Sequence, residues 1–461
     1  MKYLLLNQTF WPDHMATGQH LTELAQGLVQ RGHQVTVVTS LRAYDAPDVL
    51  FPKHEVWQGI KIYRIGSTGF GKKAKWRRAA DFASFLLLCT WQLLRLPRHD
   101  AVIALTSPPL ISAFGAAIAR RWHAKFYYWV MDFNPDEAIA AGWLRAGSLV
   151  ARILERISLF SLRNAETIVA LDRFMKDRIV AKGIPSDRVA VIPPWSHDDD
   201  VAFDPAGRER FRKEHGLDGK FVVMYSGNHS PCHPLDTLLQ AAEKLQQEPR
   251  TKNQEPITDN APSLPPINRQ PITNNDILFA FLGGGSEFAR VKQFAAERKL
   301  TNILCLPYQP LNQLSASLSA ADLHTVVMGD PFIGLVHPCK IYNILGVGTP
   351  FLYLGPAQSH IGEIISNLGT LTPSASHRHG DVDGVVQTIL KMQRAKESGV
   401  PDIPSAATFY PLGEKDRMRG FMGSGPSVPS ASAANCERTT TFYSKQTCLP
   451  QFLALLNPNN Q

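Results

Sequence analysis

Short apolar runs alternate, through the first part of the chain, with longer stretches whose apolar positions recur every three to four residues. The runs predict buried strands, and the stretches predict amphipathic helices. The opening elements set the order, with a strand at 3–6, a helix at about 19–31 and a strand at 34–40. Strands that alternate with helices predict a parallel sheet covered on both faces. Further strands are expected at 60–65, 100–106, 125–131, 167–171 and 189–194.

The alternation pauses at 192–205, a stretch rich in proline and aspartate, and then starts again. The second half predicts strands or helices at 221–227, 234–245, 277–285, 288–300, 302–308, 323–328 and 350–354. The sequence therefore predicts an α/β fold with two successive doubly wound domains. We place the first domain at 1–195, a linker at 196–205 and the second domain at 206–395.

Two segments do not fit this pattern. Residues 248–275 are rich in proline, asparagine, glutamine and threonine, which predicts a disordered insertion within the second domain. Residues 396–445 are also poor in apolar side chains and are interpreted as a low-complexity segment. A last apolar run predicts a C-terminal helix and tail at 446–461.

The composition is that of a globular protein, with 44% hydrophobic and 19% charged residues. The net charge of +8 favours an anionic partner, such as nucleic acid, acidic lipid or a phosphorylated small molecule, and a role in solubility alone is the alternative. Six cysteines occur without a C-x-x-C pair, which disfavours a zinc ribbon and suits a reducing compartment. The start, MKYLLLNQTFWP, predicts a first strand and not a secretory signal. We therefore expect a cytoplasmic protein.

The stretch 72–96 joins a cluster of lysines and arginines to a mainly apolar run. This run is shorter than the about 20 residues that a membrane-spanning helix needs. Its bases suit anionic headgroups, and Trp76 and Trp91 suit a membrane boundary. We expect 72–96 to contact the inner face of the plasma membrane, and a buried helix with a charged start is the alternative.

Three predicted strands are followed by glycine-bearing turns, which contain Gly18, Gly227 and Gly283–Gly285. A glycine at a strand end lets the backbone approach a ligand, and the next helix offers N–H groups to a phosphate. None of the turns matches G-x-G-x-x-G followed by an acid about 20 residues later, so NAD binding is not indicated.

Seven pieces of the chain, taken in order, resemble the family 4 glycosyltransferases with the GT-B fold, in the branch of polysaccharide, O-antigen and colanic acid assembly. The pieces are 18–40, 128–142, 191–200, 222–242, 279–287, 302–328 and 334–350. The resemblance implies two facing Rossmann-like domains with a cleft between them. It further implies that the N-terminal domain holds the acceptor, that the C-terminal domain holds a UDP- or GDP-linked sugar, and that transfer proceeds with retention and without a metal or other cofactor.

The stretch FIGLVHPCKIYNILGVGTP, residues 332–350, covers the place where many relatives carry two glutamates eight residues apart that hold the donor. Both acids are missing here, and Pro338-Cys339-Lys340 resembles a Pro-Ser-Lys variant of the branch. The resemblance places Lys340 at the donor diphosphate as a catalytic cation; the alternative is a lysine that only exposes its ammonium group. His337 and Pro338 are assigned to donor binding, with a structural histidine as the alternative for His337.

Other donor-binding residues follow from the same resemblance. Asn228 and His233 occupy the places of an Arg–Lys pair that binds diphosphate in relatives, and His229 and His233 are expected to share that role while partly charged. Gly227, Gly283 and Gly284 line the diphosphate, Tyr308 and Gln309 pack on the nucleobase, and Glu363 contacts the ribose. No metal site is expected at Cys232 and its two neighbouring histidines, because a fourth ligand is not evident.

Asp132 is assigned to the acceptor side, and Gly18 and Asn134 are assigned to the acceptor or to a diphosphate loop. Asp132 would orient or deprotonate the acceptor hydroxyl, and the alternative is a cap on the helix that starts after Pro135. Asp322 is interpreted as a local cap or turn residue.

The sequence thus predicts a glycosyltransferase that moves a sugar from a nucleotide sugar to a lipid-linked or glycan acceptor in cell-surface polysaccharide biosynthesis, with no nucleic-acid partner. Two alternatives stay open: a catalytically impaired nucleotide-sugar-binding module, which the missing acids favour, and a GT-B epimerase, which needs catalytic acids not found in order.

Overall fold

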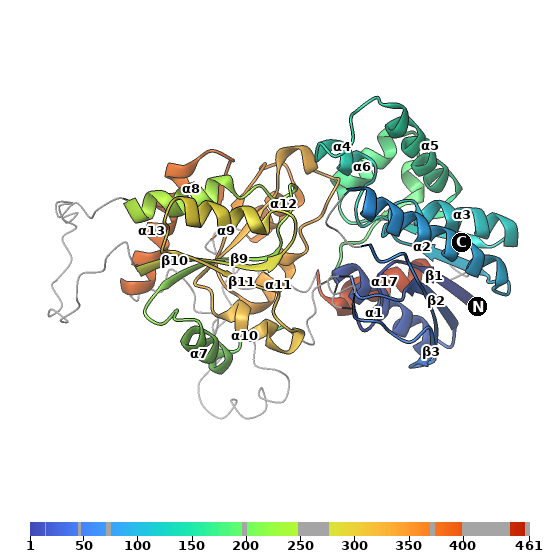
Figure 1. Ribbon diagram of the computed structural model, residues 1–461, viewed down its shortest axis with the longest axis horizontal. Coiled ribbons are helices and arrows are strands. Elements are labelled where there is room, and N and C mark those ends of the chain that lie inside the picture. Colours follow the sequence, from blue (N-terminus) through green and yellow to red (C-terminus); the bar gives the residue numbers. More distant parts are fainter. Residues whose placement is uncertain are drawn as a thin grey trace, which may run out of the picture. The chain divides into compact units, whose positions relative to one another are not determined.

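The computed structural model describes residues 1–13, 15–44, 48–70, 75–195, 201–247, 276–368, 374–398 and 443–456. The chain forms two compact units. The first contains Met1–His197, Asp330–Cys339 and Thr441–Gln461, and the second contains Asp198–Gly329 and Lys340–Thr440. Each unit is a sheet covered by helices (Figure 1). The predicted insertion 248–275 and most of the predicted segment 396–445 lie outside the described residues.

The sheet of the first unit has the order β3-β4-β2-β1-β5-β6-β7-β8. Its strands are β1 (Lys2–Leu6), β2 (Gln34–Ser40), β3 (His54–Trp57), β4 (Ile60–Ile65), β5 (Ala101–Ala104), β6 (Lys125–Trp129), β7 (Thr167–Ala170) and β8 (Val189–Val191). All neighbours are parallel except β3, which runs antiparallel to β4 at the edge. The parallel strands confirm the pattern prediction, whereas β3 was not expected because its side chains are only half-buried or exposed.

The helices of the first unit are α1 (Ala16–Gln30), α2 (Lys75–Arg95), α3 (Ile111–Trp122), α4 (Asp136–Ala140), α5 (Leu149–Asn164), α6 (Arg173–Ala181) and α17 (Lys445–Leu455), with short 3-10 turns η1 (Ser186–Arg188) and η4 (Asp330–Phe332). Gly18 was expected in a loop but lies in the first turn of α1. A Cβ at Gly18 would lie 3.2 Å from the Phe10 backbone nitrogen, so this glycine lets α1 approach the loop after β1.

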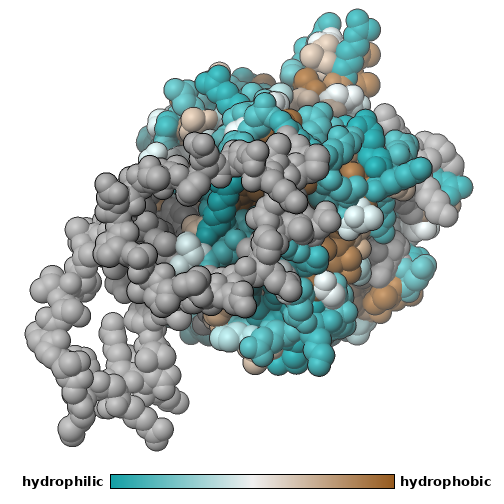
Figure 2. Space-filling view, turned by 90° about the vertical axis from the view of Figure 1, so that its left-hand side faces the viewer, coloured by the Kyte–Doolittle hydropathy of each residue, from teal (hydrophilic) through white to brown (hydrophobic). Residues whose placement is uncertain are grey.

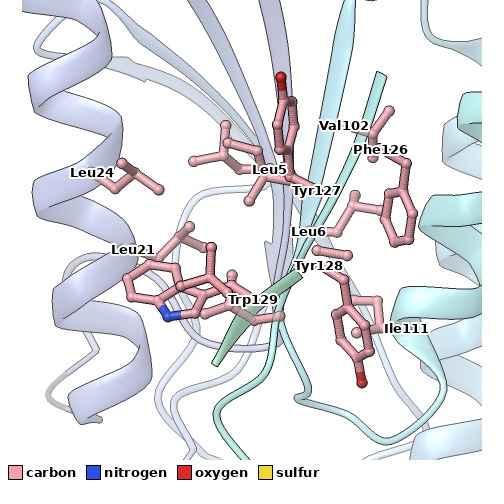
Figure 3. Packing of buried hydrophobic residues seen from close by; sticks show 14 of the residues in the cluster. Leu5, Leu6, Leu21, Leu24, Val102, Ile111, Phe126, Tyr127, Tyr128 and Trp129 are labelled. Atoms are coloured by element: carbon pink, nitrogen blue, oxygen red, sulfur yellow. The ribbon is translucent and has the colours of Figure 1, made fainter. Parts of the chain in front are cut away.

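The core of the first unit lies on both faces of its sheet, as Figure 3 shows. Successive residues of β6 point to opposite faces because side chains alternate along a strand. Trp129 lies on the side of α1, near Leu21, and Tyr128 lies on the side of α3, near Ile111 (Figure 3). Both sides are apolar and buried, which explains why β6 reads as an unbroken apolar run.

The C-terminal helix α17 completes this core. It packs against α1, and the ring centroids of Phe452 and Trp129 are 4.5 Å apart. The Tyr3 hydroxyl donates a hydrogen bond to the Leu456 carbonyl over 2.9 Å. A Cβ at Gly27 of α1 would lie 2.8 Å from a methyl carbon of Leu453, so the two helices meet closely at this glycine.

The sheet of the second unit is wholly parallel, in the order β11-β10-β9-β12-β13-β14. Its strands are β9 (Phe221–Asn228), β10 (Ile277–Gly284), β11 (Ile303–Leu306), β12 (Leu323–Val327), β13 (Phe351–Leu354) and β14 (Ser374–His377). Its helices are α7 (Pro205–Glu214), α8 (Asp236–Gln247), α9 (Phe288–Glu297), η3 (Leu311–Gln313), α10 (Leu314–Ser319), α11 (Lys340–Val347), α12 (His360–Leu368) and α13 (Val382–Ser398). β14 was not expected from the sequence because its residues, SASH, carry little apolar surface.

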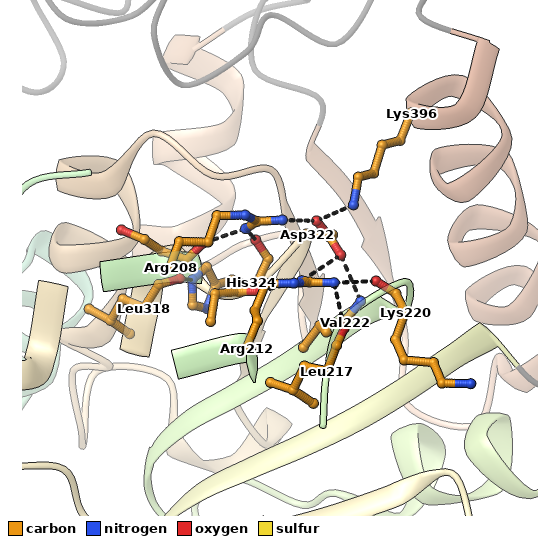
Figure 4. A network of polar contacts seen from close by, with 12 residues as sticks. Arg208, Arg212, Leu217, Lys220, Val222, Leu318, Asp322, His324 and Lys396 are labelled. Carbon is orange, nitrogen blue, oxygen red and sulfur yellow. Dashed lines mark hydrogen bonds and ion pairs between the residues drawn. The ribbon is translucent and has the colours of Figure 1, made fainter. Parts of the chain in front are cut away.

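A polar network lies at the edge of this sheet where β9 and β12 begin (Figure 4). The buried Asp322 precedes β12 and accepts hydrogen bonds from Arg208, Arg212, Lys396 and the Val222 backbone N–H. Arg212 also donates to the carbonyls of residues 217, 220 and 320. The interpretation of Asp322 as a local cap was therefore wrong, because its partners come from α7, β9 and α13.

The surfaces of the two units differ in their apolar content. Among the described residues, every large hydrophobic side chain that is exposed belongs to the first unit, except Tyr308. In the view of Figure 2 most of the described surface is hydrophilic, and hydrophobic residues are scattered over it. No described helix combines the length and the hydropathy that a membrane crossing requires.

Candidate functional site

The topology of the second sheet points to its carboxyl edge. From β9 the chain continues to β10 and β11 on one side of β9, and then returns to β12 on the other side. The strand order therefore reverses between β9 and β12. Ligands of open parallel sheets bind outside the carboxyl ends of the strands at such a switch point. Gly227 lies at the end of β9, and Lys340 begins α11 on the connection from β12 to β13. The two residues therefore flank the switch point.

The strand ends at this edge require glycine. Gly227 and Gly283 are paired in the β9–β10 register and have φ of 136° and 128°, which residues with a side chain rarely adopt. A Cβ at Gly283 would lie 2.1 Å from the Gly227 carbonyl oxygen. A Cβ at Gly285, with φ of 121°, would lie 2.3 Å from the His229 carbonyl oxygen. These glycines bring the two strand ends together.

Lys340 lies against this glycine edge. Its ammonium nitrogen is buried and lies 3.6 Å from the ring centroid of Tyr225. A Cβ at Gly227 would lie 3.2 Å from the same nitrogen. The alternative interpretation, in which Lys340 exposes its ammonium group to solvent, is therefore wrong. The lysine instead directs its charge onto the end of β9.

His229 and His233 are neutral near pH 7, contrary to the expectation that they are partly charged. Burial and the nearby Lys340 charge lower the pKa of His229 to about 4 and that of His233 to about 3. In each ring Nδ1 lies within hydrogen-bond distance of a carbonyl, 3.0 Å from Gly227 O and 2.7 Å from Val327 O. A neutral imidazole whose Nδ1–H donates to a carbonyl leaves Nε2 as an acceptor. These two rings therefore add no positive charge to the surroundings of the lysine.

Tyr308 lies against the glycines at the end of β10. A Cβ at Gly284 would lie 3.0 Å from its ring, and one at Gly283 would lie 3.3 Å from it. The ring is 46% exposed. A partly exposed aromatic ring is suited to stacking on a flat ligand. Gln309, the next residue, folds back so that its amide donates to the Pro307 carbonyl.

Asn228 and Glu363 lie at the same edge. The Asn228 carbonyl accepts a hydrogen bond of 2.7 Å from the Tyr225 hydroxyl, and its side chain is exposed. Glu363 lies in the first turn of α12, after β13, and its backbone N–H donates to the Ser359 carbonyl. The carboxyl ends of parallel strands lie at one edge of a sheet. Asn228 and Glu363 therefore lie at the same edge of the sheet as Gly227.

A pocket of about 260 Å³ opens beside His233, between the loop after β9 and the start of α9. Its lining includes Arg290, which pairs with Asp236 and Glu287. The sequence analysis did not assign Arg290, because a single arginine in an amphipathic helix carries no motif.

His337 and Pro338 belong to the first unit, together with η4. Both are buried, and His337 Nδ1 lies 2.8 Å from the carboxylate of Asp172. The other oxygen of Asp172 accepts the Met175 N–H and caps α6. This contact fits the alternative interpretation of His337 as a hydrogen-bonded structural residue.

The residues assigned to the acceptor lie in the first unit, near the switch point between β1 and β5. Burial raises the pKa of Asp132 to about 6. Its backbone N–H donates to the hydroxyl of Thr106, which follows β5. No side chain caps α4, so the capping alternative for Asp132 is not observed. Asn134 donates from its side chain to Glu137, and its carbonyl accepts from the Ser158 hydroxyl.

Comparisons with known proteins agree with this architecture. Residues 16–195 match the family model of the glycosyl transferase 4-like domain. The chain is 24% identical over 387 residues to the putative colanic acid biosynthesis glycosyl transferase WcaI of Escherichia coli K12, which covers 79% of this chain and 86% of the relative. It is 22% identical over 354 residues to the probable glycosyltransferase WbjE of Pseudomonas aeruginosa, which covers 77% of this chain and 80% of the relative.

Solved structures show the same fold. Anabaena HepE in complex with UDP and glucose superposes with a TM-score of 0.65 at 13% identity, over 99% of each chain. WaaG, a glycosyltransferase involved in lipopolysaccharide biosynthesis, superposes with a TM-score of 0.60 at 13% identity, over 99% of this chain and 100% of that one. The two Rossmann-like units, the matched domain and the relatives together show that the chain is a glycosyltransferase with the GT-B fold, in which residues 16–195 form a glycosyl transferase 4-like domain.

Proposed function

We propose that the protein transfers a sugar from a nucleotide sugar to a lipid-linked or glycan acceptor, with retention, in cell-surface polysaccharide biosynthesis. One observation carries the donor part: the buried Lys340 ammonium lies beside Gly227 at the switch point of the second sheet. The name of WcaI, a putative colanic acid biosynthesis glycosyl transferase, supports a role in polysaccharide assembly, and HepE in complex with UDP-glucose supports a nucleotide-sugar donor.

The donor is proposed to bind across the carboxyl edge of the second sheet. Its nucleobase would stack on the exposed Tyr308 ring, and its diphosphate would lie on Gly227 and Gly283. When the bond from the anomeric carbon to the phosphate oxygen breaks, negative charge grows on the leaving diphosphate. Lys340 and the amino end of α11 stabilise that charge. His229 and His233 act in this scheme as neutral groups that fix the lysine environment.

The acceptor is proposed to bind to the first unit, where Asp132 orients or deprotonates its hydroxyl. A carboxyl group whose pKa is about 6 is ionised near neutral pH and still accepts a proton readily. If Asp132 acts as a base, transfer rises about tenfold per pH unit below pH 6 and levels off above it. The Asp132→Asn variant should lose this rising limb together with most of its turnover. An unchanged limb in the variant would exclude Asp132 as the titrating group.

We also propose that the protein binds the inner face of the plasma membrane through the helical layer of α2, α3 and α5, which contact one another in that order (Figure 1). The exposed apolar residues of this layer lie on α2 and α5, where Leu87 and Leu149 are each 72% exposed. The others are Leu88, Trp91, Leu94, Val150 and Ile153. Arg95 lies over the Trp91 ring, and Arg152 is exposed on α5, so the layer also carries positive charge for anionic lipid.

Sedimentation with phosphatidylglycerol vesicles tests this surface. Binding should exceed that to phosphatidylcholine vesicles and should fall when Trp91 is replaced by aspartate. The control is Val56→Asp, at an exposed apolar position on the edge strand β3. Equal binding by both variants would exclude the layer as the lipid contact.

A donor panel tests the activity. The purified protein is incubated with UDP- and GDP-linked sugars and with undecaprenyl diphosphate-linked glycans, and released nucleotide and extended acceptor are measured. Acceptor-dependent release of UDP or GDP supports the proposal, and the anomeric configuration of the product decides retention. We expect EDTA to leave turnover unchanged. Nucleotide binding with no transfer to any acceptor of the panel would contradict the proposal.

A further inference from the structure

The contact between Lys340 and Tyr225 joins two elements that are far apart in the sequence. Tyr225 lies in β9 and is fully buried, whereas Lys340 begins α11. The ammonium nitrogen lies 3.6 Å from the ring centroid, close enough for a cation–π interaction. Such an interaction is stronger when the pair is removed from water, as it is here.

The hydroxyl of Tyr225 has its own partner. It donates a hydrogen bond of 2.7 Å to the carbonyl of Asn228, three residues further along the same chain. This bond spans Gly227, whose φ of 136° turns the strand end toward Lys340. One side chain therefore contacts both the lysine and the glycine turn beside it.

The surroundings of Tyr225 hold its ring in place. The ring meets His229 edge-on at 4.8 Å and lies 6.5 Å from the ring of Phe281, its register partner on β10. A ring enclosed on these sides can offer its face to the lysine without ordering further groups. The electron-rich face of an aromatic ring attracts a cation and is not an anion that would compete with a phosphate.

We propose that Tyr225 is a positioning residue for the diphosphate of the donor: its ring holds the Lys340 ammonium beside Gly227, where the diphosphate lies. This inference rests on the proposed function and deepens it. It states that Tyr225, which was not assigned to donor binding, determines where the Lys340 ammonium lies. Tyr225 acts through Lys340 and is not itself expected to touch the diphosphate.

The contact is tested without any ligand by NMR of the Lys340 side chain, with the resonance assigned from the Lys340→Ala variant. The ε-methylene protons should be shifted upfield by the ring current in the wild type and in Tyr225→Phe, and should return to ordinary lysine values in Tyr225→Leu. Ordinary values in the wild type would overturn the proposal.

The use of the contact is tested by calorimetric titration with UDP and, in parallel, GDP. For the nucleotide that binds more tightly, Tyr225→Leu should raise Kd about 30-fold, the effect of a desolvated cation–π contact, while Tyr225→Phe should stay within about threefold of the wild type. In a Lys340→Ala background Tyr225→Leu should have no further effect. Equal losses in both backgrounds would show a merely structural role and overturn the proposal.

Phe279→Leu is the matched control, because Phe279 is a fully buried ring of β10 in the same core cluster as Tyr225. It should lower the melting temperature as Tyr225→Leu does and leave Kd unchanged. If the wild type binds neither UDP nor GDP, the proposed nucleotide-sugar function fails, and the NMR measurement then decides separately whether Tyr225 holds Lys340.

Discussion

Buried charged groups lie at both edges of the second sheet, but their surroundings differ. At the edge where the strands begin, Arg208, Arg212 and Lys396 converge on the buried carboxylate of Asp322. At the edge where the strands end, Lys340 lies over the ring of Tyr225 and beside two neutral histidines.

The difference separates a structural role from a functional one. A buried carboxylate satisfied by three cations fixes the elements that carry them and leaves little charge for a ligand. A buried ammonium held by an aromatic face retains its attraction for an anion. Four variants test this comparison.

The largest effect is expected at the carboxyl edge. Lys340→Ala should lower transfer about 100- to 1,000-fold, because the charge on the leaving diphosphate loses its cation. The melting temperature should change little. The control is Lys292→Ala, an exposed lysine whose ammonium also lies over a ring, that of Phe288, at 4.7 Å. Steady-state assays with the donor from the panel measure both, and wild-type turnover in Lys340→Ala would refute its role.

At the opposite edge the expected loss is in stability. Asp322→Ala leaves Arg208 and Arg212 without their buried carboxylate and should lower the free energy of unfolding by about 3–5 kcal/mol. Turnover per folded molecule should stay near the wild-type value. Asp383→Ala removes an ion pair with Lys244 in which the aspartate is 80% exposed, and should cost less than about 1 kcal/mol. Urea denaturation of both variants distinguishes the two pairs, and equal costs would break the comparison.

The glycines of the two edges give a finer test. Gly227→Ala places a methyl group against Lys340 in a backbone conformation of φ 136° and should lower transfer about tenfold through the displaced ammonium. Gly219, in the loop before β9, has φ of 72°, and no atom lies within 4 Å of the position that a Cβ would take there. Gly219→Ala should therefore cost about 1–2 kcal/mol of stability and leave transfer unchanged. Loss of transfer in both variants would indicate general loosening of the sheet.

The smallest expected effect is a pH dependence of stability. Burial alone would raise the pKa of Asp322, but Arg208, Lys396 and Arg212 together lower it below its ordinary value of 3.8. A carboxyl group whose pKa is lower in the folded state stabilises the fold above its unfolded pKa and loses that contribution as the pH falls through the folded pKa. Unfolding free energies measured from pH 6 to pH 2 should therefore fall less steeply in Asp322→Asn than in the wild type. Parallel curves would show that Asp322 is not the titrating group.

Much of the fold follows from local sequence pattern. The parallel strands are continuous apolar runs because both of their faces are covered, and such runs are visible in a single sequence. The sequence pattern did not predict β3 and β14, because edge strands with half-buried side chains have no such apolar run. The first turn of α1 was predicted as a loop because it contains Gly18. The close contact with Phe10 that explains this glycine is not visible in the sequence.

The site was predictable only in its residue types. Glycines at strand ends and a lysine at a helix start are visible in sequence, and the structure brings Gly227, Gly283 and Lys340 together. The partners of charged residues were not visible, because they depend on contacts across the fold. Asp322 meets residues more than 100 positions away, and His337 meets Asp172 at a separation of 165. The neutrality of His229 likewise follows from burial, which its neighbours in sequence do not indicate.

The packing of α17 against α1 has a consequence for the folding of the protein during synthesis. Phe452 and Leu453 fill the interior of the unit that contains the first strand, so that unit lacks part of its interior until residues 445–456 have been synthesised. Domains commonly fold from the N-terminus onward during synthesis, but here the first unit needs a helix that follows the second unit in the sequence. Without α17, the part of α1 around Gly27 would lose its contact with Leu453 and become more exposed to water.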